Sequence, residues 1–183
     1  MDGKMASSVS GFFVKTNYAS DQLRDDRELA LAAIRRGGLA ALENVSEQLC
    51  NDKDFMIAAI QQNGLEALSY ASYQLYNDKD FMLAAIQQNG LALQYASDQL
   101  KGDRELVLAA IQQCGSAALR YASDQLKGDG EFMLAAVQQG GLGALGYANS
   151  QLRGDTELVL VAVQKNLDWH LELLANSSAV PQI

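Results

Sequence analysis

The sequence predicts an all-α protein, an α-α repeat stack (α-solenoid) of about five two-helix units with a cap at each end. Three observations lead to this fold class. A segment of about 26 residues recurs along the chain, each copy opens on an aspartate before an apolar run, and the first five copies have a glycine twelve residues after that aspartate. Tandem copies of this length are typical of repeat proteins whose neighbouring units share one core.

The repeat is explicit in the sequence, where NDKDFMIAAIQQNGLEALSYASYQL is followed by NDKDFMLAAIQQNGLALQYASDQL. The opening aspartates recur at a constant spacing, except that the step after Asp78 is shorter by one residue; they are Asp26, Asp52, Asp78, Asp103, Asp129 and Asp155. Each of them is predicted to be an N-cap, because its carboxylate can accept hydrogen bonds from the free N–H groups of the first helical turn. An acid two residues later is favoured by the helix dipole.

The first helix of each unit is predicted to span about eleven residues and to be buried between its neighbours. Six successive positions from Phe55 to Ile60 are apolar, which leaves no solvent face in the middle of the helix. The glycines that follow are expected to adopt positive φ and to end this helix. They are Gly38, Gly64, Gly90, Gly115 and Gly141.

The second helix is predicted to be amphipathic, because Leu65, Leu68, Ala71 and Leu75 repeat at helical spacing with polar residues between them. The serine that recurs in this helix is expected to make local hydrogen bonds. The residue before each aspartate cap is expected to tolerate positive φ, so that the second helix also ends abruptly. These residues are Asp25, Asn51, Asn77, Gly102, Gly128 and Gly154.

The predicted domain organisation is simple. Residues 17–176 form a single helical repeat domain, residues 1–16 form an N-terminal segment that need not be ordered, and residues 177–183 form a C-terminal tail. The half unit Asn17–Leu23 and the degenerate last unit are the expected caps.

Composition excludes several classes of function. Lys and Arg total 14 and Asp and Glu total 22, and the resulting net charge of -8 argues against a nucleic-acid partner, which needs a basic surface. The two cysteines, Cys50 and Cys114, form neither a disulfide framework nor a zinc pattern, so we expect the cytoplasm or another reducing compartment. The sequence has neither a signal-peptide core nor a run of about 20 apolar residues, so we expect a soluble chain without membrane insertion.

No constellation of residues indicates an enzyme, a metal site or a cofactor site. The only histidine, His170, stands in the degenerate last unit without a nucleophile at a recognisable motif. The glycines follow helix ends rather than strands, so they lack the context of a phosphate-binding loop. We therefore predict that the chain has no catalytic residues and takes no cofactor or metal.

Positions that change from copy to copy are the candidates for recognition, because positions needed for stacking stay the same. A row at i, i+4 and i+7 on the second helix varies most, and Tyr73 and Tyr76 stand out in it as possible interface anchors. The alternative is an exposed aromatic pair without a partner. The candidate protein-binding residues are Glu43, Glu47, Ser69, Tyr73, Tyr76, Gln94, Asp98, Lys101, Arg120 and Asp124.

The pattern D-[RK]-[ED]-[LF]-[VM]-L-A-A-[IV]-Q-Q-x-G-L-x-A-L-x-Y-A-S-x-Q-L resembles the bacterial and protist repeat called Domain of Unknown Function 4116, from Asn17 to about Lys165. The resemblance implies a tandem helical repeat without a settled activity. The sequence departs from the pattern at Ser116 in place of leucine, at Val45 in place of tyrosine, and at Leu167 in place of glycine.

These observations predict a non-enzymatic repeat scaffold that mediates protein–protein interaction or assembly, with another protein as its partner. One alternative is a regulatory or inhibitory protein that binds an enzyme, including a host-directed microbial factor, which would need the same variable row. A further alternative is an enzyme of unrecognised class. That alternative would require polar residues that converge on a pocket, whereas here they recur along a line.

Overall fold

A computed structural model of the chain describes residues 24–177, which fall into two compact units. The described part of the first unit comprises residues 24–88 and 95–97, and that of the second comprises residues 89–94 and 98–177. Every element in the described residues is an α-helix or a 3-10 helix, which confirms the all-α repeat fold. The predicted N-terminal segment 1–16, the half unit 17–23 and most of the predicted tail lie outside the described residues.

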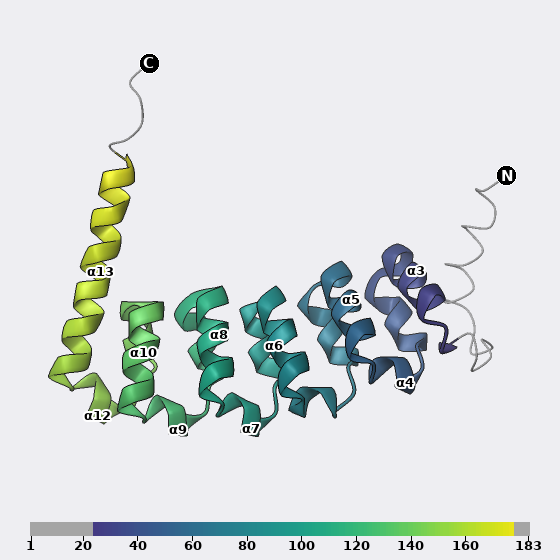
Figure 1. The fold of residues 1–183 in the computed structure, drawn as a ribbon, viewed down its shortest axis with the longest axis horizontal. Helices are drawn as coiled ribbons and strands as arrows, with labels where there is room; N and C mark the ends of the chain where they lie inside the picture. Colours follow the sequence, from purple (N-terminus) through teal and green to yellow (C-terminus); the bar gives the residue numbers. More distant parts are fainter. Residues whose placement is uncertain (1–23, 178–183) are drawn as a thin grey trace, which may run out of the picture. The chain divides into compact units, whose positions relative to one another are not determined.

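In the first unit, the first helices of successive repeats pack side by side (Figure 1). They are α3 (Arg27–Gly37), α5 (Lys53–Asn63) and α6 (Lys79–Gln88). Shorter elements connect them, namely η1 (Gly38–Asn44), α4 (Glu47–Cys50), η2 (Leu65–Tyr70) and η3 (Leu75–Asn77), where η denotes a 3-10 helix.

In the second unit, α8 (Arg104–Cys114) packs against α10 (Gly130–Gly140), and α10 packs against α13 (Thr156–Ser177). The helix α13 is twice as long as α10, with 22 residues against 11, and extends past it (Figure 1). The connecting elements are η5 (Gly115–Arg120), α7 (Asp98–Lys101), α9 (Asp124–Lys127), α11 (Leu142–Leu145) and α12 (Ser150–Arg153). The 3-10 helix η4 (Gly90–Tyr95) follows α6 in the chain.

The predicted aspartate caps are confirmed in all six repeats. In each one, a carboxylate oxygen accepts a hydrogen bond from the backbone N–H three residues later, as between Asp52 and Phe55 at 2.7 Å and between Asp78 and Phe81 at 3.0 Å. The remaining caps are Asp26, Asp103, Asp129 and Asp155. These aspartates therefore fix where each first helix begins.

The prediction of positive φ is confirmed for four glycines and wrong for Gly90. Gly38, Gly64, Gly115 and Gly141 have φ between 63° and 78°. Their ψ values lie between -150° and -165°, a combination that is essentially restricted to glycine. Gly90 is needed for a different reason, because a Cβ there would lie 2.7 Å from the carbonyl oxygen of Ala110. Gly90 lies in the repeat that is one residue shorter than the others.

The second half of a repeat is not one amphipathic helix, contrary to prediction. In the first five repeats it begins with a short helix, mostly 3-10, and a separate turn of helix follows. Ser46 has φ -65° and ψ 152°, and its hydroxyl accepts from the N–H of Leu49 at the start of α4. Ser123 and Asn149 cap α9 and α12 in the same way. Serine and asparagine break the helix because their side chains satisfy N–H groups at a new N-terminus.

The residues before the aspartate caps, which were expected to tolerate positive φ, have negative φ instead. Asn51, Gly128 and Gly154 have φ between -94° and -99°. Where the residue before the cap is Asp or Asn, its side chain accepts a hydrogen bond from the next repeat. The hydroxyl of Ser46 donates to Asp25 at 2.7 Å, and that of Ser97 donates to Asn77 at 2.8 Å. The serine therefore makes the predicted local hydrogen bond, as the cap of the following turn, and in addition links consecutive repeats.

A backbone ladder makes the same link. The N–H of the recurring serine, or of Asn149 in its place, donates to a carbonyl at the end of the preceding repeat at 2.8–3.1 Å. In the first unit the pairs are Ser46 with Arg24, Ser72 with Cys50, and Ser97 with Tyr76, and in the second unit they are Ser123 with Lys101 and Asn149 with Lys127.

The first helices form the core, as predicted, although two of the six central positions are only half-buried. Phe55, Met56, Ala59 and Ile60 are at most 3% exposed, whereas the segment 57–58 between them is half-buried. No polar or charged side chain is buried among the described residues. Within each unit, the first helices are therefore held together by apolar packing of one helix on the next.

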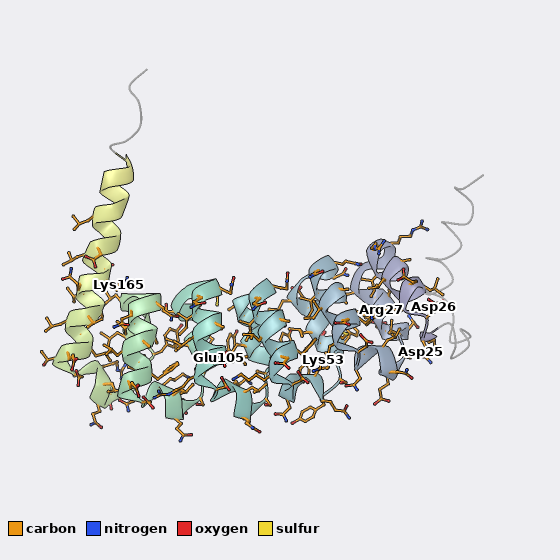
Figure 2. All side chains as sticks on the ribbon, in the orientation of Figure 1. Asp25, Asp26, Arg27, Lys53, Glu105 and Lys165 are labelled. Atoms are coloured by element: carbon orange, nitrogen blue, oxygen red, sulfur yellow. The ribbon has the colours of Figure 1, made fainter. Side chains whose placement is uncertain are left out.

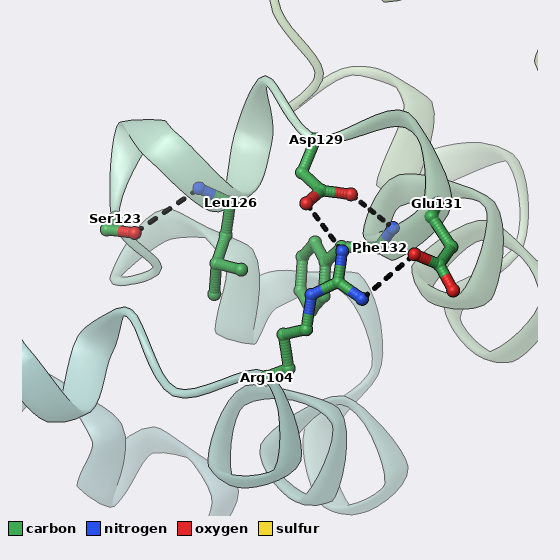
Figure 3. A network of polar contacts seen from close by, with 6 residues as sticks. All are labelled: Arg104, Ser123, Leu126, Asp129, Glu131 and Phe132. Carbon is green, nitrogen blue, oxygen red and sulfur yellow. Dashed lines mark hydrogen bonds and ion pairs between the residues drawn. The ribbon is translucent and has the colours of Figure 1, made fainter.

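Ion pairs at the first turn add a link that the sequence reasoning missed. In the first unit, the basic residue after a cap pairs with the aspartate cap of the next repeat, as between Arg27 and Asp52 at 3.4 Å and between Lys53 and Asp78. Figure 2 marks both cations at the start of α3 and α5. In the second unit Arg104 bridges Asp129 and Glu131 (Figure 3). The available signal was a basic residue directly after the recurrent aspartate.

Candidate functional site

The candidate residues do not lie along one helix, so the predicted row has a different geometry. Between Glu43 and Glu47, for example, the chain passes through the extended residues Val45 and Ser46. Seven candidates are exposed, namely Glu43, Glu47, Ser69, Tyr73, Asp98, Arg120 and Asp124, whereas Tyr76, Gln94 and Lys101 are half-buried. Five of the ten belong to the first unit and five to the second.

The structure brings two of the predicted residues together in one groove of the first unit. Glu47 and Tyr73, from consecutive repeats, line a groove of about 390 Å³. Its other lining residues are Gln48, Asn51, Ser72 and Gln74. The sequence reasoning missed these amides, although the glutamine recurs two residues after each capping serine. We call this hollow the Tyr73 groove.

Tyr73 is the most exposed large apolar side chain among the described residues, at 83%. Its ring lies edge-on to that of Tyr76, with centroids 6.4 Å apart and planes at 80°. Tyr76 in turn packs against Tyr95 at 6.2 Å, and its hydroxyl donates to the carbonyl oxygen of Leu68 at 2.6 Å. Tyr76 is therefore half-buried rather than solvent-exposed, because its ring packs against the next repeat and its hydroxyl bonds within its own.

The environment of the Tyr73 groove does not activate a nucleophile or an acid. Cys50 is a free thiol one residue before Asn51, and burial, together with the negative charge of Glu47, raises its pKa. A raised pKa keeps the thiol protonated and unreactive near neutral pH. Burial and the neighbouring Tyr95 likewise raise the pKa of Tyr76. The groove thus offers one carboxylate, several amides and one aromatic ring, which are groups for binding.

A second hollow, in the second unit, was not predicted. It has a volume of about 490 Å³ and opens where α10 gives way to glycines 140, 141 and 143. Lys165 and Asp168 of α13 line it, and Figure 2 marks Lys165 on that helix. Asp168 accepts a hydrogen bond from Gln164 at 2.9 Å, so this carboxylate has a partner on its own helix. The signal in the sequence was the glycine-rich run GGLG.

Residues 24–177 contain neither a metal-binding cluster nor a membrane-spanning helix. No three side chains of His, Cys, Asp or Glu gather there as a metal site, and the side chain of His170 lies outside the description. No described helix has the length and apolar character needed to cross a bilayer.

Comparison with known families gives three tandem matches to one family model, described as "Domain of unknown function (DUF4116)". The matches cover residues 26–76, 78–127 and 129–171. Each contains two aspartate caps, so one copy of the family domain corresponds to two structural repeats. No curated protein and no solved structure matches the chain. Because the three matches together span most of its length, the chain belongs to the DUF4116 family.

Proposed function

We propose that this chain is a non-enzymatic repeat scaffold and that the Tyr73 groove binds a segment of another protein. The observation that carries the proposal is that Tyr73 is 83% exposed while its ring packs edge-on against that of Tyr76. Tyrosine is among the residues that dominate protein interfaces, because it brings a large contact area at a low cost in side-chain entropy.

The repeats themselves indicate that folding does not require a tyrosine at this position. Its counterparts are Glu47, Asp98, Asp124 and Ser150 in the other repeats. In α9 the counterparts of Tyr73 and Tyr76 are an ion pair, with Lys127 Nζ 3.5 Å from Asp124 Oδ1. One repeat therefore has an aromatic pair where others have charges, which supports a role outside the stack.

The lining of the Tyr73 groove suggests the chemistry of the partner. Gln48, Asn51 and Gln74 present amide groups that can pair with the N–H and C=O groups of an extended peptide. The carboxylate of Glu47 favours a basic side chain, and the Tyr73 ring favours an apolar or cationic one. We therefore expect a partner segment that combines a Lys or Arg with an apolar residue.

The test uses a variant that converts this repeat to its neighbour. Tyr73→Asp with Tyr76→Lys changes SYQLY into the SDQLK of residues 97–101 and 123–127. Proteins that bind the wild type are collected by affinity purification, identified by mass spectrometry, and titrated by calorimetry as purified partners. We expect the double variant to bind the partner at least about 30-fold more weakly, as for loss of an interface anchor.

The matched control is Ser150→Ala, which changes the counterpart of Tyr73 in another repeat. It should leave the affinity unchanged. Equal affinities for wild type and the double variant, with both proteins folded by circular dichroism, would reject the Tyr73 groove as the binding site.

A further inference from the structure

The helix α13 has an apolar side that no described residue covers. Leu160, Val163, Leu167 and Leu171 are 64%, 45%, 52% and 64% exposed. They follow one another at spacings of three and four residues, so they lie on one side of the helix. We call these four residues the α13 stripe. It makes up four of the six exposed large hydrophobic residues in the described part of the chain.

Comparison with α10 shows why the α13 stripe is uncovered. Val137 and Leu134 of α10 are the counterparts of Val163 and Leu160, one repeat earlier in the sequence. Val137 is fully buried and Leu134 half-buried, because α13 packs on α10. Leu158 and Ala162 are the buried side of α13. At 100° per residue, Leu160 lies about 200° around the helix from each of them, so the stripe faces away from the stack.

The α13 stripe is also longer than a single repeat would provide. Leu167 stands where the first five repeats have glycine, and the helix does not turn back there but continues to Ser177. Leu167 and Leu171 therefore extend the apolar side by an additional turn. From residue 160 to residue 171 the stripe is about 16 Å long, at 1.5 Å per residue.

We propose that a second copy of this chain covers the α13 stripe with its own α13, in an antiparallel, two-fold pair. Within the repeats, the element that covers this side of a first helix is another such helix. Among the described helices, α13 is the one with an uncovered apolar side, so a second copy offers α13 itself. The pairing is separate from the Tyr73 groove and does not rest on the function proposed for it.

The order of residues along the stripe matches itself in reverse. An antiparallel pair centred near residue 165 places Leu160 of each copy opposite Leu171 of the other, and Val163 opposite Leu167. A two-fold interface requires this self-complementarity. A parallel pair would instead bring together the acidic N-terminal ends, each with the exposed carboxylates Asp155 and Glu157. The antiparallel arrangement keeps these charges apart and sets the two helix dipoles in opposition.

The experiment is sedimentation velocity of the full chain over about 1 to 200 µM, the range suited to a small interface. We expect the wild type to shift from one copy to two as its concentration rises. Leu160→Gln with Leu167→Gln should remain a single copy throughout, and circular dichroism should show unchanged helix content, because both side chains are exposed. Lys165→Gln, on another side of α13, should dimerise like the wild type.

The dependence of dimerisation on salt concentration is a second test. Each copy carries a net charge of -8, so two copies repel each other at low ionic strength. Screening shortens this repulsion to about 10 Å at 0.1 M salt, so the association constant of an apolar pair should rise several-fold between about 20 and 300 mM. A fall with salt would indicate an ionic interface and overturn the proposal.

Cross-linking decides the orientation. A mixture of Leu160→Cys and Leu171→Cys chains, treated with oxidised glutathione, should form the mixed disulfide dimer, whereas Leu171→Cys alone should not. The reverse result would overturn the antiparallel pairing. A wild type that stays a single copy, or a Leu160/Leu167 variant that still dimerises, would overturn the α13 interface itself. Tyr73→Asp should dimerise normally, which keeps this outcome separate from the test of the Tyr73 groove.

Discussion

The two halves of each repeat hold together in different ways. In α5 the contacts are apolar side chains, with Phe55 and Met56 fully buried, and the same pattern returns in each first helix. In the segment that follows, the backbone N–H of Ser72 and its hydroxyl make the links to the preceding repeat. Side chains there are free to vary because the backbone makes the connection. The second half also buries apolar residues such as Ala67 and Leu68, but the exposed positions that vary between copies lie there.

The largest expected effect comes from breaking the first half. Ile86→Ala removes a side chain that is fully buried in α6 and should lower the free energy of unfolding by about 2–5 kcal/mol, through lost burial and a residual cavity. Leu83→Ala should cost less, because Leu83 is only half-buried. Urea denaturation measures both values, with the exposed neighbour Gln87→Ala as control. Equal costs for Ile86 and Leu83 would contradict the buried side assigned to α6.

The second effect concerns the junction between the halves, where Asp78 caps α6. Asp78→Ala should lower the free energy of unfolding by about 0.5–2 kcal/mol, because the N–H of Phe81 loses its acceptor. Asp78→Asn is the matched control, since asparagine caps about as well but cannot pair with Lys53. If Asp78→Asn lowered the free energy of unfolding and Asp78→Ala did not, Asp78 would not act as the N-cap of α6.

The contribution of Asp78 to the free energy of unfolding should depend on pH. The hydrogen bond from Lys53, and then that from the backbone N–H of Phe81, hold the pKa of Asp78 below its usual value of 3.8. A lowered pKa stabilises the folded state above the pKa of the unfolded chain, and this contribution is lost as the pH falls through the folded value. The difference in unfolding free energy between wild type and Asp78→Ala should therefore be larger at pH 7 than near pH 2.

Adding an ion pair between two repeats should have the smallest effect on stability. Gly130 stands where the four preceding repeats have Arg or Lys after the cap, and a Cβ there would meet Leu152 at an ordinary 3.5 Å. Gly130→Arg places a guanidinium one repeat before Asp155, at the same sequence offset as in the existing pairs. It should raise the free energy of unfolding by about 0.5–1 kcal/mol at low salt.

The control for this variant is Gly130→Ala, which restricts the backbone without adding a charge. Melting curves at two salt concentrations separate the contributions. A gain that is identical in both variants would show that Asp155 forms no pair.

Much of the fold follows from residues that act locally. Asp52 caps α5 and Gly64 ends it because one carboxylate and one positive-φ position suffice, and both are visible in the sequence. The second half was predicted wrongly because its leucines keep helical spacing across a break at Ser72. Helical spacing does not reveal that the recurring serine starts a new turn and bonds to the preceding repeat as well.

The candidate site was predicted only in part for a related reason. Variation between copies identified Glu47 and Tyr73, which line one groove. It also selected Tyr76, whose ring packs against Tyr95 of the next repeat and whose hydroxyl is held by Leu68 of its own. Such contacts arise only once the repeats stack, so a residue that varies between copies can still be part of the packing.

The backbone ladder makes each repeat an interchangeable module. Its donor and acceptor are separated by the same length of chain in four pairs, and by one residue less between Ser97 and Tyr76. Although this spacing is one residue shorter, the N–H of Ser97 still donates to the carbonyl oxygen of Tyr76 at 2.8 Å. Because main-chain atoms form the joint, a duplicated or deleted repeat brings its own connector, and its surface residues can change without disturbing the joint. Lengthening the protein by copying, and then altering one copy as at Tyr73, is a route to new specificity that this architecture permits.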